Sequence, residues 1–64
     1  MNRQKPPGIF AREARDTSDE YFEARIANCE SVEHLQEAAK VEGESKARSE
    51  RIATIYQRIN ELES

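Results

Sequence analysis

The sequence predicts an all-α protein: a small three-helix bundle, made of a short helix and an antiparallel helical hairpin, with a basic N-terminal arm. Apolar residues recur at spacings of three and four positions over much of residues 17–64. No segment shows the alternation of apolar and polar residues that is typical of a strand. Because 64 residues are too few for two domains, we divide the chain into an arm, residues 1–16, and one helical domain, residues 17–64.

Charge is distributed unevenly along the chain, whose formal net charge is −3. Residues 1–15 contain four basic side chains and one acidic, residues 16–44 contain two and nine, and residues 45–64 contain four and three. We expect the basic arm to be flexible or partly helical, and Ile9 and Phe10 either to dock onto the body or to await a partner. The Pro6-Pro7 pair favours extended backbone over residues 1–8, and the arm has room for about two helical turns after it.

The first helix of the bundle is predicted over residues 18–28. Thr17 and Glu20 form a capping-box pattern, in which the hydroxyl accepts from a first-turn amide and the glutamate reaches back. Phe22, Ile26 and Cys29 follow at spacings of four and three, which place them on one face. This face is the expected contribution of the helix to the core.

The second helix is predicted over residues 32–42, with Ser31 as its N-cap. Val32, Leu35 and Ala39 supply its apolar stripe. Gly43 stands where a left-handed residue commonly closes a helix, so we expect the chain to turn there.

The third helix is predicted over residues 45–62 and has the most regular pattern of the chain. Ile52, Ile55, Ile59 and Leu62 are spaced three, four and three positions apart, with Tyr56 alongside. The large apolar residues are few relative to the conformational entropy of ordering the chain, so burial within one molecule is limited. This limit favours self-association, for example as a homodimer, or binding to a larger partner.

The residue types needed for catalysis are not grouped in recognisable patterns. Cys29 and His34 are the only soft metal ligands, whereas a structural zinc site needs four ligands. Two carboxylates acting as acid and base need a concave, partly dry site, which so small a helical chain can hardly enclose. Gly8 and Gly43 are isolated and form no phosphate-binding loop. We therefore expect a chain that is not an enzyme and that has no cofactor and no metal.

Three functions remain. The first is a small protein-interaction or regulatory module, which binds a protein partner through apolar and acidic side chains of its helices. The second is a dimeric regulator that binds nucleic acid with the arm and the start of the third helix. The third is an acidic inhibitor that imitates nucleic acid with residues 16–44. The partner-binding candidates are Ile9, Phe10, Glu33, Glu37, Ile55 and Tyr56, and the nucleic-acid-binding candidates are Arg3, Lys5, Arg12, Arg15, Lys46, Arg48 and Arg51.

The expected location of the chain is the cytoplasm, without membrane association. No run of apolar residues approaches the length of a membrane-spanning helix, and the N-terminus lacks the apolar stretch of a signal peptide. The single Cys29 cannot form a disulfide within the chain, which favours a reducing compartment.

Residues 21–62 also share a pattern with other small helical proteins. The pattern consists of Tyr21 and Arg25-Ile26, Ser31-Val32-Glu33-His34-Leu35, Glu42-Gly43-Glu44, Arg48, Tyr56-Gln57-Arg58-Ile59 and Leu62. With these residues the chain resembles small uncharacterised prokaryotic helical-hairpin domains of unknown function. The resemblance implies a helical hairpin and brings no activity with it.

Overall fold

The computed structural model describes residues 5–64, and Arg3 of the predicted arm lies outside them. The chain forms four helices within these residues: α1 (Pro7–Arg15), α2 (Asp19–Asn28), α3 (Val32–Glu44) and α4 (Ser49–Glu63). The prediction of an all-α protein is confirmed. The number of helices differs, because three helices were predicted and the arm contains a fourth.

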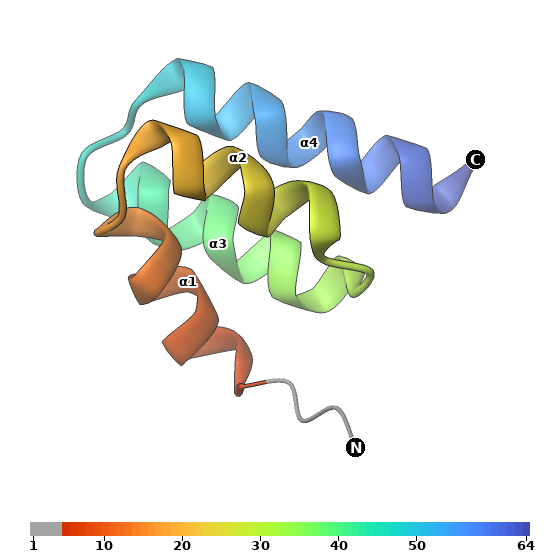
Figure 1. Ribbon diagram of the computed structural model, residues 1–64, viewed down its shortest axis with the longest axis horizontal. Helices are drawn as coiled ribbons and strands as arrows, with labels where there is room; N and C mark the ends of the chain where they lie inside the picture. Colours follow the sequence, from red (N-terminus) through yellow and green to blue (C-terminus); the bar gives the residue numbers. More distant parts are fainter. Residues whose placement is uncertain (1–4) are drawn as a thin grey trace.

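The helices pack around one small core (Figure 1). α3 and α4 run antiparallel, α1 packs mainly against α3, and α2 contacts both α4 and α1. Phe22, Ile26, Leu35, Ile55 and Ile59 are all buried at the centre. No helix among the described residues has both the length and the apolar composition needed to cross a bilayer.

Helix α1 belongs to the core, although residues 1–16 were predicted as a flexible or partly helical arm. Ala11 and Ala14 are each 1 % exposed and face the body of the protein. Their small side chains let the backbone of α1 approach α3 closely. The helix begins at Pro7, earlier than predicted, because proline is well tolerated in the first turn, where its missing N–H has no helical partner anyway.

The N-caps of the next two helices were predicted with unequal success. Ser31 caps α3 as predicted, since its Oγ accepts a hydrogen bond of 3.3 Å from the His34 amide. For α2 the cap is Ser18, whose Oγ lies 3.5 Å from the Tyr21 amide, and the prediction of Thr17 was wrong by one residue. The carbonyl of Thr17 instead accepts from the Arg51 guanidinium at 2.9 Å, which ties that residue into the α1–α2 loop.

The reversal between α3 and α4 takes place after Gly43, which was the predicted left-handed residue. Gly43 is helical, and α3 continues to Glu44. The left-handed position is Ala47, with a φ of 51°, and its N–H donates to the Glu42 carbonyl at 2.6 Å. A residue with a Cβ therefore occupies a backbone region that glycine adopts at lower cost.

Ala47→Gly is expected to stabilise the protein by about 0.5–1 kcal/mol. The substitution removes the steric cost of a left-handed alanine. This gain exceeds the cost of the extra conformational entropy that glycine gives the unfolded chain. Ala53→Gly is the matched control, because Ala53 is exposed inside α4, and it is expected to destabilise by about 1 kcal/mol. Urea denaturation of the three proteins measures both effects. Destabilisation by both substitutions would contradict the assigned role of Ala47.

Candidate functional site

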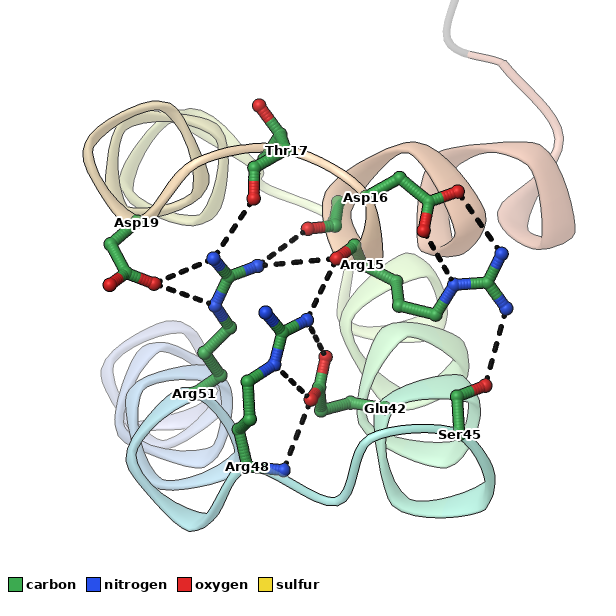
Figure 2. A network of polar contacts seen from close by, with 9 residues as sticks. Arg15, Asp16, Thr17, Asp19, Glu42, Ser45, Arg48 and Arg51 are labelled. Carbon is green, nitrogen blue, oxygen red and sulfur yellow. Dashed lines mark hydrogen bonds and ion pairs between the residues drawn. The ribbon is translucent and has the colours of Figure 1, made fainter.

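Arg51 joins the beginning of α4 to the end of α1 (Figure 2). Its side chain is 6 % exposed, and its guanidinium donates to the carbonyls of Ala14 at 3.0 Å and Thr17 at 2.9 Å. It also donates to Asp19 Oδ1 at 2.6 Å and lies 4.6 Å from the centre of the Phe22 ring. Arg51 thus satisfies carbonyls that the end of α1 leaves without helical partners.

Glu42 and Arg48 form a second ion pair beside Arg51 (Figure 2). The Glu42 side chain is 2 % exposed, and its Oε2 accepts from Arg48 Nε at 2.7 Å. The same oxygen accepts the Arg48 amide at 3.1 Å, so Glu42 caps the start of α4, where Arg48 provides no side-chain cap of its own. The hydrogen bond from the Arg48 side chain lowers the pKa of Glu42 below its ordinary value.

Several of the predicted nucleic-acid-binding arginines are therefore engaged within the protein. Arg48 donates to the Arg15 carbonyl at 2.7 Å, and Arg15 itself pairs with Asp16 at 2.9 Å. Arg51 is buried. Lys46 and Arg12 are exposed, but they lie on different elements, the α3–α4 loop and α1. The arginines at the start of α4 therefore hold the end of α1 in place.

The predicted partner-binding residues do not form one surface. Ile55 and Ile59 are buried in the core, so this part of the α4 stripe packs within the chain. The role of Ile55 at an interface stays a prediction. Tyr56 is 53 % exposed on the same helix. Glu33 is exposed and Glu37 half-buried, and their register places both on the side of α3 opposite Leu35.

Ile9 and Phe10 are separated by the register of α1. Ile9 is 46 % exposed, whereas Phe10 is half-buried and packs against the core. The Phe10 ring contacts the His34 ring edge-on at 5.5 Å. Phe10 thus lies next to the N-terminal end of α3, while Ile9 faces solvent.

An open groove lies between α1 and α2 and consists of two adjoining hollows. The first measures about 410 Å³ and is lined on its apolar side by Phe10, Tyr21 and Ala24. The second measures about 610 Å³ and extends past Arg12 and Asp16. Lys5, Tyr21 and Arg25 line both hollows, and Glu13 pairs with Lys5 and Arg25. We call these two hollows together the α1–α2 groove.

The carboxylate of Glu13 lines the second hollow and is bridged by Lys5 and Arg25, which line both hollows. Glu13 accepts from Lys5 Nζ at 2.7 Å and from the Arg25 guanidinium. Both hydrogen bonds lower the pKa of Glu13, and the one from Lys5 has the larger effect. The Arg25 guanidinium also lies 5.9 Å from the centre of the Phe10 ring, at a distance that allows a cation–π contact. The groove therefore places the exposed Lys5 ammonium and the half-buried Arg25 guanidinium near the Phe10 ring.

His34 and Cys29 support the groove through local hydrogen bonds. His34 Nε2 lies 2.6 Å from the Lys5 carbonyl, and Nδ1 lies 2.9 Å from Ser31 Oγ. Because a carbonyl only accepts, a hydrogen on Nε2 satisfies the first contact and leaves Nδ1 to accept from the Ser31 hydroxyl. Cys29 Sγ is 3.6 Å from the Ser31 carbonyl. His34 thus holds the segment before α1 against the start of α3.

A metal site and a buried polar group without a partner are both absent from residues 5–64. No three His, Cys, Asp or Glu side chains are grouped there to hold a metal ion. Every buried side-chain nitrogen or oxygen of this part of the chain has a hydrogen-bond partner. Comparison of the chain with family models, curated proteins and solved structures finds no match. The resemblance to helical-hairpin domains stays a prediction.

The sequence reasoning did not identify Glu13, Tyr21 and Arg25 as site residues. Tyr21 is 71 % exposed, although it directly precedes the buried Phe22. Glu13 and Arg25 are oppositely charged and 12 positions apart, with the α1–α2 loop between them, and this was the one sequence feature that could have suggested their pairing. The packing of α1 against α2 brings the two side chains together.

Glu42→Gln is expected to destabilise the protein by about 2 kcal/mol near neutral pH, since it leaves the charge of Arg48 unpaired. The effect is smaller than for a fully buried pair because the Arg48 side chain is 32 % exposed. The pKa of Glu42 is lower in the folded protein than its ordinary value of 4.5. Ionised Glu42 therefore stabilises the protein at pH values above 4.5. This stabilisation is lost as pH falls through the lowered pKa.

The variant should therefore show a shallower loss of stability on the acid side, measured by urea denaturation at a series of pH values. Glu44→Gln is the control, because Glu44 is an exposed neighbour on the same helix, and we expect it to change stability by less than about 0.5 kcal/mol. Equal effects of the two substitutions would contradict the role given to Glu42.

Proposed function

We propose that this chain is a small non-catalytic protein-interaction module, with an accessory or regulatory role, which binds a protein partner through the α1–α2 groove. The single observation that carries this proposal is the exposure of Tyr21, whose side chain is 71 % exposed at the rim of a groove that also contains the Phe10 ring. Aromatic side chains beside a pocket are typical of the residues that contribute most to protein binding.

The contacts around the groove support a binding surface that is preorganised in the free protein. The Arg51 and Glu42 networks fix the end of α1, and His34 fixes its beginning. A preformed surface loses little conformational entropy on binding. We therefore expect the partner to bind the groove without a rearrangement of the helices.

The same contacts weigh against the nucleic-acid-binding alternative. Arg15, Arg48 and Arg51 pair with acidic side chains, which leaves fewer cations to neutralise phosphates. The acidic-inhibitor alternative has only the acidic surfaces of the helices in its favour. We place the module in the cytoplasm, where the free thiol of Cys29 stays reduced.

Tyr21→Ala is expected to abolish capture of the partner in a pull-down from source-cell lysate treated with nuclease, because it removes the exposed aromatic ring from the groove. Tyr56→Ala is the matched control: Tyr56 is 53 % exposed on α4, outside the groove, and its loss should leave capture unchanged. Quantitative mass spectrometry of the retained proteins provides the measurement.

Loss of capture with Tyr56→Ala alone would move the binding surface to α4. Retention that disappears on nuclease treatment would favour the nucleic-acid-binding regulator and contradict the proposed function. Equal capture by both variants and the wild type would exclude the groove as the binding surface.

A further inference from the structure

We infer that the occupant of the α1–α2 groove is an acidic segment of a protein partner, with an apolar side chain next to an aspartate or glutamate. This inference rests on the proposed function and adds the chemistry of the partner. It follows from the arrangement of Lys5, Glu13 and Arg25, in which a carboxylate of the chain itself already occupies the position between two cations.

The first step concerns access to the two cations. The side chains of Lys5 and Arg25 are 57 % and 34 % exposed, and that of Glu13 is 36 % exposed. A carboxylate arriving from solvent can therefore replace Glu13 as the acceptor, or share the guanidinium and ammonium donors with it. Arginine presents several N–H groups in a planar fork, so one guanidinium can serve two carboxylates.

The second step concerns the charge balance along the groove. Lys5, Arg12 and Arg25 contribute three positive charges, against two negative charges from Glu13 and Asp16. Asp16 is held by Arg15, which donates to both of its carboxylate oxygens. Arg12 forms no ion pair within residues 5–64. The groove therefore has one cation, Arg12, without an ion-pair partner in the described part of the chain, and one carboxylate, Glu13, that two cations share.

The third step concerns the apolar side of the groove. Phe10 and Ala24 offer a surface for one aliphatic or aromatic side chain, and the exposed Tyr21 ring can cover it from the rim. An acidic residue next to an apolar residue matches this juxtaposition of cations and rings. A lysine-rich segment would instead meet three cations at close range.

The charge of the remaining surface also favours binding of an acidic segment in the groove. The net charge of the chain is −3, while the groove has more cations than anions. Exposed acids such as Glu23, Glu33 and Glu50 lie on other faces of the helices. Over a Debye length of about 8–10 Å these acids repel an acidic partner, so its favourable approach is confined to the groove.

The test is selection of a short-peptide display library on the full wild-type chain, followed by affinity measurement of the enriched peptides by fluorescence anisotropy. We expect enriched sequences with aspartate or glutamate beside an apolar residue, binding more weakly as salt rises. Arg25→Gln should weaken this binding by about tenfold or more, as expected for the loss of a charge-assisted hydrogen bond.

Glu13→Gln separates a binding role from a merely structural one. Removal of the competing carboxylate should raise the affinity for the acidic peptides several-fold, whereas a structural defect would lower it. Glu50→Gln is the matched control, because it removes the same charge from an exposed position on α4 that lines neither hollow of the groove, and it should leave the affinity unchanged.

The outcomes distinguish this inference from the proposed function. Enriched peptides that depend on Tyr21 but are neutral or basic would overturn the inference and leave the interaction module standing. The absence of any peptide that depends on Tyr21 would overturn both. Equal gains in affinity with Glu13→Gln and Glu50→Gln would show a general charge effect and would also overturn the inference.

Discussion

The position of α1 depends on the guanidinium groups at the start of α4. The last carbonyls of a helix have no partners within it, and at the end of α1 those of Ala14 and Arg15 accept from Arg51 and Arg48 at 3.0 and 2.7 Å. Glu42 holds Arg48 in turn, and the Phe22 ring lies beneath Arg51. These charged groups hold the C-terminal end of a helix whose buried side chains are the small Ala11 and Ala14.

The groove is a consequence of this arrangement. Since α1 packs mainly on α3 while α2 contacts α4, the two N-terminal helices diverge and leave an open space between them. Glu13 and Arg25 span this space, and Lys5 joins them because His34 holds its carbonyl. The same polar contacts that stabilise the fold therefore also position the side chains of the proposed binding surface.

The sequence was sufficient to predict what depends on local patterns. The helical character, the Ser31 cap and the core face of Phe22 and Ile26 follow from residues within one or two turns of each other. The packing of α1 was predicted only as an alternative, through Ile9 and Phe10, because alanines give a weak apolar signal. Ala11 and Ala14 are nevertheless the most deeply buried residues of that helix, and Phe10 packs beside them. The left-handed turn was assigned to Gly43 on residue type alone, whereas the Glu42–Arg48 contacts place it at Ala47.

The site was harder to predict because its partners are distant in sequence. Arg51 and Ala14 are 37 positions apart, and His34 and Lys5 are 29 apart. No helical spacing relates such residues, so Arg48 and Arg51 were interpreted as nucleic-acid contacts. Their partners at the end of α1 follow from the packing of the helices, which hydrophobic periodicity alone does not specify.

The most direct test is native-state amide hydrogen exchange on the wild-type chain and on Arg51→Gln. If Arg51 holds α1 in place, the amides at the end of α1, Ala11–Arg15, should exchange at least about tenfold faster in the variant, which corresponds to one lost charge-assisted hydrogen bond. The amides of Leu35–Ala39 in α3 should keep most of their protection. Equal acceleration in both helices, or unchanged exchange in α1, would contradict this account.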